Sequence, residues 1–199
     1  MSEPITTLTD YALAGVACIF AGFLLRIGWL KRQVSVGCWG MAFGFVALAA
    51  ALGGTCHGFS AQLGALGYDL WRAMIYSLSW ASLMLLSGSV IGSSVRPYRN
   101  WLLLAALIKT LWLWGSSPHF EAAALDYMIS LGIALLLQAW RPAAASPWLA
   151  SGILTSGLAL ILLHGQPSVG GLTGADLYHL VQLIGLGLLY QGAKRLRDR

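Results

Sequence analysis

The chain alternates long apolar stretches with short polar connections, and this pattern repeats seven times along its 199 residues. A helix needs about 20 apolar residues to cross a hydrocarbon layer about 30 Å thick. Lipid offers no hydrogen-bond partners to backbone N–H and C=O groups, so each stretch is expected to be a helix. The sequence therefore predicts an all-α, polytopic membrane protein, a seven-transmembrane helix bundle that forms one domain over residues 1–199. The expected spans are residues 11–30, 36–58, 68–93, 101–116, 120–140, 147–163 and 176–193.

The composition supports a membrane class and leaves no room for a separate soluble domain. Hydrophobic residues make up 58% of the chain and charged residues only 10%. The first ten residues are acidic, and they lack both a basic segment and a small-residue cleavage site. They are therefore not expected to be a removable signal peptide.

Basic residues are concentrated at one end of the predicted bundle, which sets the expected orientation. Connections rich in Lys and Arg stay in the cytoplasm, so the N-terminus is expected outside and the C-terminus inside. The basic residues that give the net charge of +5 then mark the cytoplasmic side and offer a surface for anionic lipid head groups. They do not indicate that the protein binds nucleic acid. We expect an integral, multi-pass protein of the inner (plasma) membrane with lipids as its partners. The residues used are Arg26, Lys31, Arg32, Arg96, Arg99, Arg141, Lys194, Arg195, Arg197 and Arg199.

Histidines and acids gather at the opposite end of the predicted helices. Ionisable groups in or just under a bilayer are costly, so such a cluster is by default a candidate functional site. His57 closes the second span after the pair Gly53 and Gly54, and glycine pairs let another backbone or a ligand approach closely. An interfacial histidine at a helix end is the alternative interpretation. The cluster consists of His57, Asp69, His119, Glu121, Asp126, His164, Asp176 and His179, of which His119 and His164 rank lowest because loop histidines are usually solvated.

The last span presents a polar face toward the bundle interior. Asp176, His179 and Gln182 are each three residues apart, which places them on one side of a helix beside Tyr178. Gln182 and Tyr178 are expected to support the site or to be structural.

One buried ion pair is also expected at this end of the bundle. Lys109 and Asp126 fall at similar depth in the fourth and fifth spans, so they are natural partners. Asp126 could alternatively accept a hydrogen bond from a metal-bound histidine.

Two segments carry a resemblance to known membrane proteins. Gly-Gly-Thr-Cys-His-Gly at residues 53–58, followed by Asp69, and Asp-Leu-Tyr-His-Leu-Val-Gln at residues 176–182 resemble an uncharacterised family of small bacterial seven-helix proteins. More remotely, they are similar to the alkaline ceramidase and adiponectin-receptor (CREST) superfamily. That resemblance implies a zinc-dependent intramembrane hydrolase, acting in lipid metabolism on a lipid amide or ester near the extracytoplasmic face. His57, Asp69 and His179 match its histidine, aspartate and last histidine positions.

The chain departs from the superfamily pattern at two positions. Ala175 stands where a further histidine is expected, and Gly53 stands in place of a serine. A catalytic zinc needs three protein ligands and an open water position, so Asp176 is the predicted third metal ligand beside His57 and His179. Asp69 is then the predicted catalytic residue, which orients the zinc-bound water or moves its proton.

Three other functional classes stay open at this point. A transporter or metal permease would also place histidines and acids in a bundle, but it should show internal repeats or broken helices. A haem-binding electron carrier could use His57 and His179 as axial ligands. In a partner subunit of a membrane complex, the cluster would be only a buried polar network.

Overall fold

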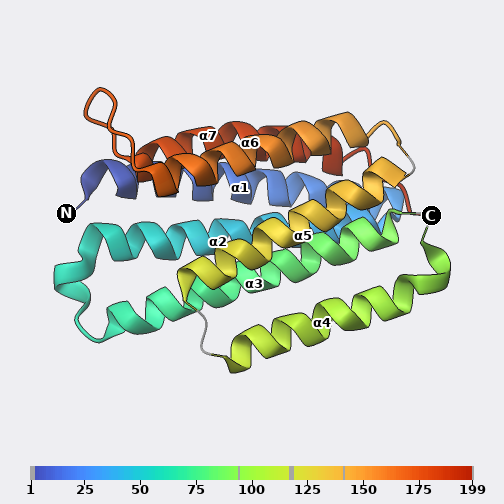
Figure 1. Cartoon of the computed structure of the whole chain (residues 1–199), viewed down its shortest axis with the longest axis horizontal. Helices are drawn as coiled ribbons and strands as arrows, with labels where there is room; N and C mark the ends of the chain where they lie inside the picture. The colour runs from blue at the N-terminus through green and yellow to red at the C-terminus, as the bar shows by residue number, and fades with distance from the viewer. Residues whose placement is uncertain (1–2, 94, 117–118, 141, 199) are drawn as a thin grey trace.

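The computed structural model describes residues 3–93, 95–116, 119–140 and 142–198. Within these ranges the chain forms seven α-helices that run alongside one another in an elongated bundle (Figure 1). Arg141 and Arg199, two of the residues used above for orientation, lie outside the described residues. The helices are α1 (Pro4–Lys31), α2 (Val34–Leu63), α3 (Leu66–Ile91), α4 (Arg99–Gly115), α5 (Phe120–Trp140), α6 (Ser146–Gly165) and α7 (Gly174–Ala193), with a short 3-10 turn η1 (Arg96–Tyr98) before α4.

Five of the described helices, α1, α2, α3, α5 and α6, are long and apolar enough to cross a membrane. α4 is only 17 residues long. α7 carries the polar residues Asp176, His179 and Gln182 in its first half, and these reduce its hydropathy. Several helices could thus cross a membrane, which indicates a membrane protein.

The first helix is the largest departure from the predicted boundaries. It begins at Pro4 rather than at residue 11, because proline at the first helical position already has a helical φ and lacks the N–H that would have no partner there. Thr7, Asp10 and Ala14 follow at helical spacing and belong to the same buried stripe as Ala17 and Leu24. The polar segment expected to precede the bundle is therefore part of it.

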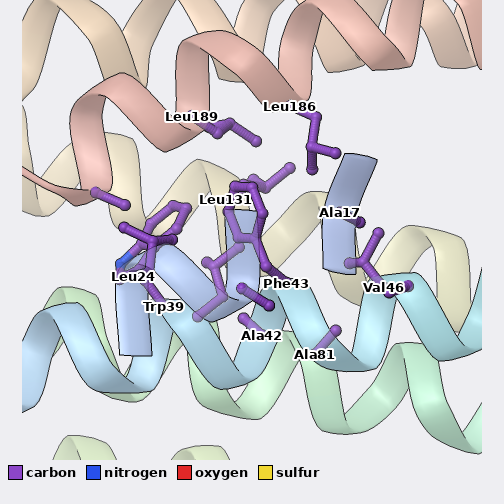
Figure 2. Close-up of a cluster of buried hydrophobic side chains, with 14 of the residues drawn as sticks. Ala17, Leu24, Trp39, Ala42, Phe43, Val46, Ala81, Leu131, Leu186 and Leu189 are labelled. Carbon is purple, nitrogen blue, oxygen red and sulfur yellow. The ribbon is translucent and has the colours of Figure 1, made fainter. Parts of the chain in front are cut away.

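The hydrophobic core lies between α1, α2, α3, α5, α6 and α7, as Figure 2 shows for residues such as Leu24, Phe43 and Leu131. Trp39 is fully buried in it, next to Phe43. Neighbouring helices approach closely at glycines. A Cβ on Gly40 of α2 would lie 2.9 Å from the backbone nitrogen of Leu25 in α1. α4 stands at the edge of the bundle, against α3 (Figure 1).

One end of the bundle collects the start of α1, the α2–α3 turn and the loop between α6 and α7 (Figure 1). The other end holds the C-terminus and the links between α1 and α2, α3 and α4, and α5 and α6. The first of these ends contains the predicted histidine-and-acid cluster.

Candidate functional site

A cavity of about 210 Å³ opens among the helices at the end where α1 begins. Most of its wall is aliphatic or aromatic. Its polar groups come from α1, α2 and α7: Asp10, His57, Tyr178 and His179. The cavity therefore combines an apolar body with a small polar region. The apolar lining consists of Leu13, Val46, Ala49, Ala50, Gly53, Trp71, Met74, Leu78, Phe120, Leu163 and Ala175.

A smaller hollow of about 50 Å³ shares Leu13 and Tyr178 with this cavity and extends further into the bundle. Tyr127 and Gln182 line it. The Oε1 atom of Gln182 is buried and has no hydrogen-bond partner in the part of the chain that the structure describes. The hollow is thus lined by a residue whose side-chain oxygen is buried and has no partner among the described residues.

A buried polar contact joins His179 of α7 to Asp10 of α1. His179 Nε2 lies 3.0 Å from Asp10 Oδ1, and the two side chains are only 9% and 7% exposed. The other ring nitrogen, Nδ1, lies 3.0 Å from Thr9 Oγ1. His179 is therefore fixed at both nitrogens by residues of α1.

The surrounding hydrogen bonds favour one placement of the protons in this pair. The Thr9 hydroxyl has two backbone acceptors within its own helix, the carbonyl oxygens of Thr6 at 2.9 Å and Ile5 at 3.1 Å. We infer that it donates to one of them, and in that tautomer of His179 the Nδ1–H group donates to Thr9 Oγ1. Nε2 then faces Asp10 Oδ1 with one proton between them. With one proton between them the pair has no net charge, whether that proton sits on nitrogen or on oxygen, and this lowers the cost of burying it.

Asp10 reaches this position because α2 carries glycines where α1 crosses it. A Cβ on Gly54 would lie 2.8 Å from Asp10 Cβ and 3.3 Å from the carbonyl oxygen of Thr7, distances that no side chain could occupy without a shift. A Cβ on Gly53 would lie 3.8 Å from Asp10 Oδ2. That oxygen is buried and unpartnered within the described residues. The predicted close approach at the glycine pair is thus made by α1, and one carboxylate oxygen of Asp10 has no partner among the described residues.

A second histidine–carboxylate pair lies at the more open side of the cavity. His57 Nδ1 is 3.0 Å from Glu3 Oε2, with side chains 31% and 54% exposed. The His57 ring stands edge-on to Trp71, with centroids 6.1 Å apart. His57 and His179 therefore line one cavity, each beside a carboxylate from the start of α1.

Asp176, the predicted third metal ligand, accepts hydrogen bonds at the start of α7 instead. Its Oδ1 accepts from the Thr6 hydroxyl at 2.8 Å, and its Oδ2 accepts from both the backbone N–H and the hydroxyl of Thr173, each at 2.8 Å. With the reciprocal bond from its own N–H to Thr173, it forms a capping box at the start of α7. Asp176 does not line the cavity, whereas its neighbour Ala175 does.

The three predicted zinc ligands do not form a metal cluster in this arrangement. Both carboxylate oxygens of Asp176 and both ring nitrogens of His179 are already engaged. Among the described residues no group of three or more His, Cys, Asp or Glu side chains is placed to hold a metal ion. The residues present therefore do not fit the zinc set.

The remaining predicted site residues lie away from the cavity. Asp69 is exposed in the first turn of α3 and is not part of the lining, so the structure does not bring it to His179. Lys109 and Asp126 form the predicted ion pair between α4 and α5, and Lys109 also donates to Ser130 at 3.2 Å. His119 and His164 are exposed.

Asp10 is the main residue that the sequence interpretation missed. Its signal was the helical spacing from Thr7 and Asp10 to Ala14, Ala17 and Ala21, which continues the buried stripe of α1 through a polar segment. A carboxylate in register with such a stripe is buried, and so it requires a partner.

Comparisons with known proteins assign the chain to a family but give no function. No curated protein and no solved structure matches it, and nothing found connects it to the alkaline ceramidase and adiponectin-receptor superfamily. Residues 5–198 match a family of unknown function (DUF6962), and the chain belongs to that family.

Proposed function

We propose that the protein is a multi-pass protein of the inner (plasma) membrane that binds a lipid-derived amphiphile in the cavity at the start of α1. The observation that carries the proposal is that Asp10, His57 and His179 line one otherwise apolar cavity, with His179 in contact with Asp10 and His57 in contact with Glu3. In this topology all seven helices cross the bilayer, and the basic end faces the cytoplasm. The cavity then faces the extracytoplasmic side.

The lining favours a ligand with a short apolar body and a polar group that donates a hydrogen bond. Apolar ligands are held mainly by aliphatic and aromatic walls, and a few polar groups fix their orientation. Asp10 Oδ2 is a buried acceptor without a partner among the described residues, at the edge of the cavity. An O–H or N–H group of the ligand would satisfy it and remove the cost of leaving that oxygen unpaired.

A specific observation also favours hydrolysis of an ester or amide in this cavity. Where two ionisable pairs lie at one site, one can act as the general base and the other as the general acid. Asp10, supported by His179, takes a proton from water as the water oxygen attacks the carbonyl carbon. Protonated His57, at the open side and beside Glu3, gives a proton to the leaving oxygen or nitrogen as its bond to carbon breaks. A water at the mouth then returns the proton from Asp10 to His57.

Binding is tested with purified protein in detergent, by quenching of tryptophan fluorescence with 8-bromo-octanol. Trp71 lines the cavity, so the signal lost in Trp71→Phe isolates quenching at the site. We expect a saturable Trp71 component that Asp10→Asn weakens about tenfold or more, the loss expected when a charged hydrogen-bond partner is replaced. The matched control, His164→Gln, changes an exposed histidine and should bind as the unmodified protein does. Quenching that never saturates, or that is equal in Asp10→Asn, would overturn the binding proposal.

Hydrolysis is tested separately with octanoyl esters and amides of a fluorogenic coumarin. We expect release of coumarin by the unmodified protein and by His164→Gln, and a loss of about a hundredfold or more in Asp10→Asn, a typical contribution of general base catalysis. If the unmodified protein binds saturably but releases no coumarin, the hydrolysis proposal is refuted and the binding proposal remains.

A further inference from the structure

The opposite end of the bundle contains a second hollow of different chemistry. A groove of about 630 Å³ lies between the C-terminal part of α1, the α5–α6 link and the residues that follow α7. Four of its seven lining residues are cations. The described lining contains no carboxylate. The lining residues are Ile27, Lys31, Ala143, Ala144, Lys194, Arg195 and Arg197.

Two of the cations are held in place by neighbouring side chains. The Arg195 guanidinium lies over the Trp148 ring, 4.9 Å from its centroid, and donates to the side-chain oxygen of Gln191 at 2.9 Å. The Lys194 ammonium lies 5.1 Å from the Tyr190 ring centroid. Cations fixed in this way lose less side-chain freedom when they bind an anion.

The nearby carboxylate of the C-terminal segment is directed elsewhere. Asp198 accepts from the backbone N–H groups of Val34 and Ser35, at 2.7 and 2.9 Å, and so caps the start of α2. Its charge is used at a helix N-terminus, where negative charge is favoured. The cations of the groove are therefore not paired with it.

Exposed apolar side chains flank the groove at the same end. Trp29 and Leu30 precede Lys31 and are 80% and 63% exposed, and Trp140, at the end of α5, is 81% exposed. Exposed tryptophans at a helix end are typical of the head-group region of a bilayer. A ligand in the groove would thus meet cations at its head and apolar surface beside it.

We propose that this groove binds the head group of an anionic phospholipid, with preference for a head group that carries two phosphates. Basic pockets between helices at one membrane face are suited to such head groups, and each cation near an anionic surface contributes about fivefold to binding. The described lining has four cations and no carboxylate. Its positive charge is therefore larger than the negative charge of a single phosphate. The occupant is the lipid rather than free phosphate, because Trp29, Leu30 and Trp140 offer contact to its chains.

The test is native mass spectrometry of the purified full-length protein in detergent, titrated with a diphosphatidylglycerol, a phosphatidylglycerol or a phosphatidylcholine. We expect the strongest retention for the two-phosphate lipid and the weakest for the zwitterionic one. Lys31→Gln/Arg197→Gln removes two exposed cations of the groove and should weaken binding about thirtyfold. The matched control, Arg26→Gln/Arg99→Gln, removes two exposed cations that do not line it and should bind nearly as the unmodified protein does.

Three results would overturn the proposal. Equal loss in the groove and control variants would mean that only overall charge attracts the lipid. Equal retention of the three lipids would mean that the head group is not recognised. Displacement of the lipid by millimolar pyrophosphate alone would assign the groove to a free phosphate compound. Both double variants are first checked for unchanged helix content by circular dichroism, so that a loss of binding is not a loss of fold.

Discussion

The Gly54→Ala variant tests how the site is built, because Asp10 can take its position only if residue 54 has no side chain. A Cβ added at Gly54 would lie 2.8 Å from Asp10 Cβ, whereas unstrained carbon contacts lie at about 3.5–4.0 Å. The Gly54→Ala variant must therefore move α1 relative to α2 by about 0.7 Å or more at this crossing. A shift of that size takes the 3.0 Å contact between Asp10 and His179 out of the narrow range of a hydrogen bond.

The cost of this overpacking is about 1–3 kcal/mol in the free energy of unfolding. Glycine to alanine also stabilises a helix by about 1 kcal/mol, so the variant is compared with one that makes the same exchange without a clash. Gly44→Ala serves, since its Cβ would lie 4.0 Å from Ala21 Cβ at the same α1–α2 interface.

Chemical unfolding of the two variants, followed by circular dichroism, measures the difference. We expect Gly54→Ala to be less stable than Gly44→Ala by about 1–3 kcal/mol and to lose the saturable quenching of Trp71. Equal stability and equal quenching in the two variants would refute the role given to the glycine.

Three further predictions concern contacts outside the cavity. Asp176→Ala removes the capping box of α7 and should cost about 0.5–2 kcal/mol, against less than about 0.5 kcal/mol for Asp69→Ala at an exposed first turn; chemical unfolding measures both, and equal costs would contradict the cap. Lys109→Met leaves Asp126 buried without its cation and should cost about 1–3 kcal/mol. Lys109→Met/Asp126→Leu should recover most of that loss, and a double variant no more stable than the single one would argue against the pair. Asp198→Ala should speed hydrogen exchange of the first N–H groups of α2 by about tenfold, and unchanged exchange would show that the cap is unimportant.

The sequence predicted the helices well because apolar length is a direct consequence of the membrane. All seven predicted stretches are helical, and residues 120–140 match the described bounds of α5. The start of α1 was wrong because Thr6, Thr7 and Asp10 were read by their polarity and not by their spacing, which continues the buried stripe. Composition alone cannot tell a polar residue in a connection from one that a partner helix will satisfy.

The site was predictable only in part. His57 and His179 were singled out from their helix positions, and the structure places both at one cavity. The Lys109–Asp126 pair was predicted from equal depth and is confirmed. Asp176 was taken for a metal ligand although Thr173 stands three residues before it, which is the spacing of a capping box. The partner of Asp10 could not be predicted, because His179 lies 169 positions further along the chain.

The central claim is that Asp10 and His179 share one proton inside the bundle. Nitrogen NMR of protein labelled at its four histidines tests it directly, because only His179 should show one ring nitrogen donating to Thr9 and the other facing a carboxylate. We expect Asp10→Asn to change the ring-nitrogen signals of His179 far more than those of the exposed His119 and His164. Ring-nitrogen signals of His179 that do not respond to Asp10→Asn would contradict the account.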